Sequence, residues 1–307
     1  MNFKCRDDIV QLTPEWQGDR SDDGRPRVPD ALLARMEAVT TEEVWSVLWN
    51  KGYKYQFVGD WKVMHPGRIL VGRAVTAVFV PRRPDLHACL MEHGHKQEGR
   101  IGEMNSWVIE TLAKDDVVVV DLFDKVYEGT FSGGNLGTAI ARRTGRGQVV
   151  YGGIRDVQQV LGIDNLQTYY RGNDPTPIRD VTLVGLNVPC RIGGAVCLPG
   201  DVVLGTPAGI LFVPPQLAEE CAAHSERTRL REIFGLQRLR EGKYTSAQMD
   251  TKWTPPIEAE FHDWRKTNTP DDLKHLTWEQ ETGADKPTDN PDQLMVGKPP
   301  GKQETRL

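Results

Sequence analysis

The chain has 307 residues, a hydrophobic fraction of 38% and a formal net charge of −5. This length suits one large domain or two ordinary ones, and the hydrophobic fraction is sufficient for a sizeable core. The acidic balance argues against nucleic-acid binding, which needs a basic face. Because the sequence has no apolar run of about 18 residues, no membrane span is expected.

The N-terminus and the cysteines indicate a reducing compartment. The first eight residues, Met-Asn-Phe-Lys-Cys-Arg-Asp-Asp, lack the apolar core of a secretory signal. The cysteines stand at positions 5, 89, 190, 197 and 221, an odd and scattered set that is unlike a disulfide framework. We therefore expect a cytoplasmic protein in which Cys190 and Cys197 are buried as small hydrophobic residues.

The first part of the chain reads as a polar segment, two helices and a strand. Residues 1–28 have no clear period and are expected to form an extended arm. Residues 29–52 have the apolar spacing of helices, with Thr40 or Thr41 as N-cap of the second helix and Gly52 at its end. Ile69–Val80 is a β-branched apolar run and is predicted to be a strand.

The middle of the chain alternates between the two patterns. Residues 86–114 are expected to be helical, and Val117–Val120 is typical of a strand buried on both faces. Further strands are predicted over 178–188, 195–198 and 202–213, and a helix from Pro215 to about Glu241. This order indicates a mixed α/β domain without the regular βαβ alternation of a doubly wound sheet.

Beyond Thr245 the composition becomes polar and proline-containing. Trp253, Trp264 and Trp278 need burial there, either on their own domain or in a tail that wraps another subunit. Residues 283–307 lack hydrophobic periodicity and are expected to be flexible. We therefore divide the chain into an N-terminal arm (1–28), a main domain (29–245) and a C-terminal extension (246–307).

Residues 133–156 are the most informative stretch. Gly133 and Gly134 open a predicted helix, whose N-terminal N–H groups form an anion site. The strand after this helix ends in Arg155 and Asp156, at the same edge of the sheet. Arginine can hold a carboxylate bidentately, and a single aspartate can anchor hydrated Mg²⁺ or Mn²⁺. The stretch predicts a site for a metal-chelated α-keto acid; the alternative is an ordinary turn beside a solvated ion pair.

Other chemistry-bearing residues have less specific contexts. His87, His93 and His95 lack the spacing of a familiar zinc site, so a polar helix or loop is expected. Asp121 follows a buried strand, where active-site groups of α/β proteins emerge. Glu232 belongs to a helix face that is either solvated or able to reach a neighbouring subunit's site.

From about Thr41 to Thr245 the motifs resemble the RraA-like family. That family includes class II pyruvate aldolases acting on 4-hydroxy-4-methyl-2-oxoglutarate and the regulator of ribonuclease E activity. The anchors agree in order and spacing; they are Val71-Gly72-Arg73-Ala74-Val75-Thr76, Asp116-Val117-Val118-Val119-Val120-Asp121, Gly134-Asn135-Leu136, Gly153-Ile154-Arg155-Asp156, Tyr170-Arg171-Gly172, Asn187-Val188-Pro189 and Pro199-Gly200-Asp201-Val202-Val203 with Ala208-Gly209-Ile210.

The resemblance implies a swivelling β/β/α three-layer sandwich, here with extended arms, assembled as trimers or hexamers with sites between subunits. It implies that Asp156 carries Mg²⁺ or Mn²⁺ and that Arg155 holds the pyruvyl oxygens. Gly134, Asn135 and Leu136 would form the carboxylate site, the last two through backbone N–H groups. The metal would then stabilise the enolate left by aldol cleavage or by decarboxylation of oxaloacetate.

One departure from the family pattern concerns the catalytic proton. The aldolases carry an acidic residue where this chain has Gly134. Asp121, Asp124 or a glutamate such as Glu232 from the next subunit is the candidate replacement. Three functions stay open: a metal-dependent lyase for a pyruvyl-containing acid, a hydratase, dehydratase or isomerase of a sugar-derived keto acid, and a non-catalytic protein-binding regulator.

Overall fold

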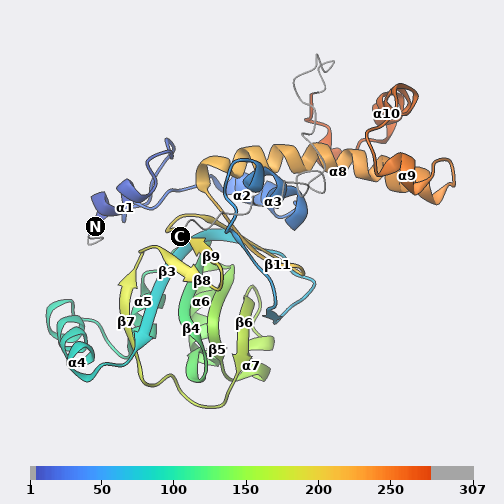
Figure 1. The fold of residues 1–307 in the computed structure, drawn as a ribbon. Helices are drawn as coiled ribbons and strands as arrows, with labels where there is room; N and C mark the ends of the chain where they lie inside the picture. The colour runs from blue at the N-terminus through green and yellow to red at the C-terminus, as the bar shows by residue number, and fades with distance from the viewer. Residues whose placement is uncertain (1–4, 278–307) are drawn as a thin grey trace, which may run out of the picture. The chain divides into compact units, whose positions relative to one another are not determined.

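The computed structural model describes residues 5–277, and the chain divides into two compact units, Met1–Ser225 and Glu226–Leu307. The first unit is built around a mixed sheet whose nine strands follow the order β1-β11-β10-β3-β4-β5-β6-β2, with β7 paired to β3 (Figure 1). Its strands are β1 (Phe57–Val58), β2 (Lys62–Val63), β3 (Leu70–Pro81), β4 (Asp116–Ser132), β5 (Gly147–Ile154), β6 (Gln167–Asn173), β7 (Val181–Leu186), β10 (Val202–Thr206) and β11 (Gly209–Val213), and a separate hairpin comprises β8 (Cys190–Ile192) and β9 (Ala195–Cys197).

Strands β3, β4, β5 and β6 are parallel and adjacent in chain order. The crossovers between them carry α4 (Pro84–Glu92), the π-helix η1 (His93–Gln97) and α5 (Met104–Glu110), then α6 (Gly134–Thr144), then α7 (Val157–Leu161). Residues 70–173 therefore form a regular βαβ series, and the expectation that such alternation is absent was wrong. The missed element is β6, whose short Thr168-Tyr169-Tyr170 core has polar neighbours.

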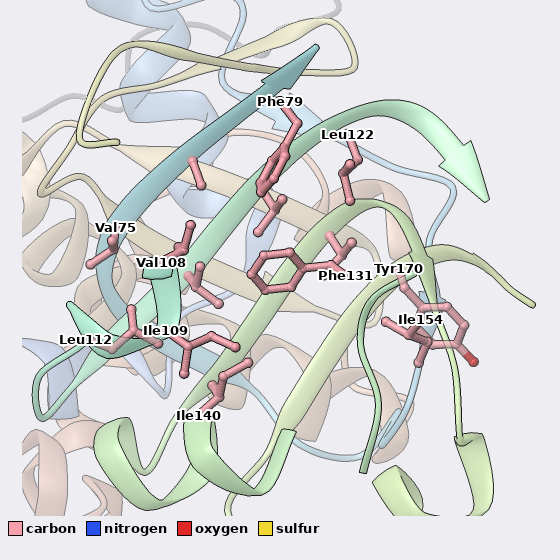
Figure 2. Packing of buried hydrophobic residues seen from close by; sticks show 14 of the residues in the cluster. Val75, Phe79, Val108, Ile109, Leu112, Leu122, Phe131, Ile140, Ile154 and Tyr170 are labelled. Atoms are coloured by element: carbon pink, nitrogen blue, oxygen red, sulfur yellow. The ribbon is translucent and has the colours of Figure 1, made fainter. Parts of the chain in front are cut away.

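The two faces of this sheet are covered differently. On one face Val118 and Val120 pack against α5 and α6, in the cluster that Figure 2 shows around Phe131 and Ile140. On the other face Val117 and Val119 pack against the β8–β9 hairpin. The molecule thus has hairpin, sheet and helix layers, which confirms the predicted mixed α/β class and its β/β/α layering.

Local sequence signals explain most element boundaries. Thr40 caps α3 (Thr41–Asn50) in a capping box with Glu43, and Gly52 follows with φ +88°. We expected helical structure throughout residues 86–114, and this was wrong for the part between η1 and α5. Gly99 and Gly102 adopt positive φ there and separate the two helices. Among residues 5–277, no helix has the length and apolar composition needed to cross a bilayer.

The N-terminal segment, which we expected to form an extended arm, is anchored on the main domain. It contains α1 (Arg6–Leu12), and Arg25 forms a buried ion pair with Asp116 at 2.9 Å between Nη1 and Oδ1. Val28 is fully buried, and its carbonyl accepts a hydrogen bond from buried Arg73. A segment without periodicity can join a core through single anchors, which pattern analysis does not detect.

A second layer of helices covers the antiparallel part of the sheet. Leu33 and Met36 of α2 (Asp30–Met36), together with α3, pack on Val71, Leu204 and Leu211. Chain residues Pro215–Leu217 form a short 3₁₀ turn, η2, before α8 (Ala218–Arg240). Cys190 and Cys197 lie opposite each other in the β8–β9 hairpin. Both are buried free thiols, as expected, and burial raises the pKa of each.

The second unit contains the end of α8, α9 (Ser246–Met249), α10 (Pro255–Asn268) and the 3₁₀ turn η3 (Asp271–Leu273). Phe234 of α8 packs on Phe261 and Trp264 of α10, and Arg231 lies over the Trp253 ring at 4.1 Å. These two tryptophans therefore pack within their own unit. The predicted boundary at residue 245 differs from the division at Ser225, because the end of α8 packs with α10 in one apolar cluster. Trp278 and residues 283–307 lie outside the described residues.

Candidate active site

The start of α6 and the end of β5 meet at one edge of the sheet. Ser132, the last residue of β4, pairs with Ile154, and its carbonyl accepts a 3.0 Å hydrogen bond from the Arg155 N–H. The next residue, Asp156, adopts a left-handed conformation with φ +52° and is the N-cap of α7. Its Oδ2 accepts a 3.1 Å hydrogen bond from the backbone N–H of Gly134. A carboxylate that follows β5 thus occupies the first donor of α6.

Gly133 makes this approach possible. A Cβ at this position would lie 2.2 Å from Asp156 Oδ2 and 2.9 Å from Arg155 Cγ, closer than real Cβ atoms come. A Cβ at Gly134 would meet only Gln159, with its Cβ at 3.1 Å. The first glycine is therefore required by the contact itself, whereas the second is only tightly packed.

The next donors of α6 are available to a ligand. The backbone N–H groups of Asn135 and Leu136 belong to the first turn, which has no intrahelical acceptors. Gly137, by contrast, donates to the Gly133 carbonyl at 2.8 Å. Two neighbouring N–H groups at the positive end of the helix dipole are suited to bind a carboxylate.

A cavity of about 690 Å³ opens beside this edge. Gly133, Leu136 and Arg155 line it, and the Arg155 side chain is 42% exposed, with Nε 3.6 Å from Asp156 Oδ2. The remaining wall includes an apolar part and a charged part. The apolar part contains Phe79, Met91, Met104, Phe131 and Ile178, and the charged or titratable part contains Arg82, His87, Glu103, Arg179 and Asp180.

The charge of this lining favours anions. Three arginines face two carboxylates, and the N-terminus of α6 adds a partial positive charge. Arg82 lies 4.0 Å from Asp180, a long and exposed ion pair that leaves its guanidinium accessible. The cavity is therefore suited to a small acid with more than one anionic group.

Comparison with known proteins is consistent with this geometry. The family model RraA-like, described as Aldolase/RraA, matches residues 36–212, which is more than half of the chain. The chain belongs to the RraA-like family. Its match includes β3 to β6, α6 and the Arg155–Asp156 pair.

Individual relatives are more distant. A protein of Azotobacter vinelandii, provisionally named a 4-hydroxy-4-methyl-2-oxoglutarate aldolase, is 34% identical over 113 residues, which cover 36% of this chain and 66% of the relative, just under two thirds of its length. The crystal structure of Streptomyces coelicolor RraAS2, described as an unusual member of the RNase ES inhibitor RraA protein family, matches with a TM-score of 0.59 and 24% identity over 70% of this chain and 98% of that chain. An uncharacterized protein from Pseudomonas syringae pv. tomato matches with a TM-score of 0.60 and 21% identity over 76% and 98% of the two chains. The two structures establish the shared fold.

The RraA-like core brings some predicted site residues together and not others. Arg155, Asp156, Gly134, Asn135 and Leu136 meet at the edge just described. Asp121 is not among the residues that line the cavity, because alternation along β4 directs it to the hairpin face, where burial raises its pKa and the Phe123 N–H donates to it.

The other candidate acids are also accounted for. Asp124 accepts a 2.9 Å hydrogen bond from Arg171 and is not among the cavity-lining residues. Glu232 lies on the part of α8 that belongs to the second unit. His93 and His95 contact Glu98 and the Arg100 carbonyl, which confirms the expected polar helix or loop.

Sequence reasoning missed Arg82, His87 and Arg179 as cavity residues. Arg82 and His87 follow the carboxyl end of β3, and Arg179 precedes β7, which is antiparallel to β3. A sheet in which β3 and β5 are parallel brings their carboxyl ends to one edge, where ligands of α/β proteins bind. The strand order would have predicted that these residues lie together. It could not be used because the βαβ series was not recognised in the sequence.

Asp156 is also the residue that fits a divalent cation. Within residues 5–277, no three His, Cys, Asp or Glu side chains gather as a metal-binding group. An ion such as Mg²⁺ that keeps most of its waters needs only one or two carboxylates. The Asp156 side chain is 41% exposed, and the described residues provide no partner for its Oδ1, so this oxygen suits a single anchor for a hydrated ion.

Proposed function

We propose that this RraA-like protein is a divalent-metal-dependent carbon–carbon lyase for pyruvyl-containing keto acids, with aldol cleavage and oxaloacetate decarboxylation as its reactions. The observation that carries the proposal is the convergence of Arg155, Asp156 and the free donors of α6 at the edge of an anion-favouring cavity. The aldolase name of the Azotobacter vinelandii relative supports it.

The chain's own residues have distinct roles in this proposal. The N–H groups of Asn135 and Leu136 bind the carboxylate of the keto acid. The Arg155 guanidinium donates to the keto oxygen, where negative charge grows as the carbon–carbon bond breaks. Arg82 and Arg179 attract the distal acidic group of the substrate into the cavity.

Asp156 is the proposed cation ligand through Oδ1, while Oδ2 stays on the Gly134 N–H. Bound there, Mg²⁺ or Mn²⁺ supplies Lewis-acid stabilisation of the developing enolate. Arg155 lines the cavity, and its Nε lies 3.6 Å from Oδ2 of the same carboxylate.

The family resemblance also leads us to propose self-association as a trimer or hexamer with sites between subunits, in the cytoplasm and without a nucleic-acid partner. Light scattering of the purified full chain tests the assembly, with a mass three or six times that of the 34.5 kDa chain as the expected result.

Pyruvate release tests the activity. The full chain with Mg²⁺ is assayed on 4-hydroxy-4-methyl-2-oxoglutarate and on oxaloacetate, with a lactate dehydrogenase readout. We expect release that EDTA abolishes and Mg²⁺ restores, and a fall in kcat of about 100-fold for Arg155→Lys, because lysine cannot replace the guanidinium fork. Arg142→Lys, at an exposed position of α6, is the matched control. Loss of water or isomerisation without pyruvate would instead identify the hydratase or isomerase alternative.

A further inference from the structure

Aldol cleavage requires a group that moves a proton. The hydroxyl on the carbon to be released must lose its proton, and the enolate carbon must later gain one. Gly134 provides no side chain for this, and neither Asp121 nor Asp124 lines the cavity. The titratable groups of the lining are His87, Glu103 and Asp180.

Of these three groups, His87 is held in the most defined position. It lies in the first half of α4, shortly after the carboxyl end of β3 (Figure 1). Its Nδ1 lies 3.0 Å from Oγ1 of Thr182, a fully buried residue of β7 that pairs with Val80 of β3. Thr182 thereby fixes the ring, and the described residues provide no partner for Nε2.

Burial and a nearby positive charge favour the neutral form of this imidazole. Partial burial and the charge of Arg82 lower the pKa of His87, and Glu103 opposes them from the residue before α5. Arg179 and Asp180, which precede β7, and Arg155, which follows β5, are the other charged groups of the lining. A neutral imidazole can accept a proton, and its conjugate acid can return it.

Building on the proposed function, we propose that His87 is the acid–base residue of aldol cleavage, in place of the acid absent at Gly134. Nε2 takes the hydroxyl proton, the C–O bond becomes a carbonyl, and the electrons of the breaking carbon–carbon bond enter the pyruvate enolate. After the carbonyl product leaves, the imidazolium returns its proton to the enolate carbon, which gives pyruvate and neutral His87. Thr182 is the positioning residue.

Comparison of the two lyase reactions tests this assignment. Loss of CO₂ from oxaloacetate needs no proton removed from a hydroxyl, so the two reactions depend on His87 to different degrees. We expect His87→Asn to lower kcat for aldol cleavage by about 10²–10⁴-fold, and to lower it for decarboxylation at least tenfold less. The acid limb of the cleavage pH profile disappears in the variant, and added imidazole partly restores cleavage in His87→Ala.

Controls separate the possible failures. His93→Asn, outside the cavity-lining set, keeps both activities, and Thr182→Val shifts the pH profile of cleavage with a smaller loss of kcat. Equal losses in both reactions, or no loss in cleavage, overturn the role of His87 while leaving the lyase intact. A wild-type chain inactive on both substrates overturns the proposed function itself, and with it this role.

Discussion

Asp156 Oδ2 accepts a 3.1 Å hydrogen bond from the backbone N–H of Gly134. This contact joins the residue after β5 to the helix after β4, and it gives one carboxylate two tasks. Oδ2 caps α6, and Oδ1, for which the described residues provide no partner, is the proposed ligand of a hydrated cation. The contact also determines which helix donors are left for a substrate, because the first one is already used.

The two tasks of Asp156 can be separated by two substitutions. Asparagine tolerates the left-handed conformation and retains a cap acceptor, whereas alanine provides neither. We expect both Asp156→Asn and Asp156→Ala to lower Mg²⁺-dependent pyruvate release by about 100-fold or more. Only the alanine variant should also lose about 1–2 kcal/mol of unfolding free energy in urea titrations. Full activity of the asparagine variant would refute the cation role.

The two glycines at the start of α6 should differ in tolerance. Gly133→Ala places a Cβ 2.2 Å from Asp156 Oδ2, so the carboxylate and the neighbouring Arg155 must move. We expect its activity to fall by about 10²-fold, as for a loss of site geometry. Gly134→Ala meets only Gln159, with its Cβ at 3.1 Å, and should retain most activity. If the two variants behave alike, the contact does not determine the site.

The N-terminal segment should contribute to stability through one buried ion pair. Both side chains of Arg25 and Asp116 are 4% exposed, so Arg25→Ala leaves a buried carboxylate without its cation. We expect a loss of about 3–5 kcal/mol in unfolding free energy by urea denaturation. Arg27→Ala, on a side chain that is 50% exposed, should change it by less than about 0.5 kcal/mol. Similarly small effects for both variants would show that the N-terminal segment does not stabilise the domain through this ion pair.

Asp201 should make stability depend on pH. Burial raises its pKa to about 8 against a 2.7 Å hydrogen bond from the Leu198 N–H. Unfolded, this carboxyl ionises at about pH 3.9, so between that value and pH 8 the folded state binds more protons. Its contribution to the unfolding free energy therefore falls by about 1.4 kcal/mol for each pH unit of rise in that window.

Asp201→Asn keeps an oxygen acceptor and removes the titration. The difference in unfolding free energy between Asp201→Asn and wild type should therefore grow in favour of the variant from about pH 5 to about pH 7, at that slope, in denaturant titrations. Other titrating groups cancel in the difference. A difference that is independent of pH would show that Asp201 ionises in the folded state as it does in the unfolded state.

Much of the candidate site could be predicted from the sequence because its residues lie close together along the chain. Gly133 to Asp156 is one helix and one strand, and their ends meet whenever the two pack as a βα unit. The helix caps and the apolar strand cores are likewise determined by residues a few positions apart, as at Thr40 and Glu43. The Arg25–Asp116 pair and β6 escaped prediction, because one depends on contact over 91 positions and the other on neighbouring strands.

The sequence by itself therefore determined most of the helices and strand cores of this RraA-like protein, the stretch proposed to hold an anion and a cation, and the family to which the chain belongs. Only the tertiary structure decided which of these residues share a cavity. Side chains alternate between the faces of a strand, so strand register directs Asp121 to the hairpin layer. The parallel order of β3, β4 and β5 brings His87 and Arg82 to the edge that Arg155 occupies. The pairing of strands that are far apart in the sequence depends on tertiary packing, which no local sequence pattern encodes.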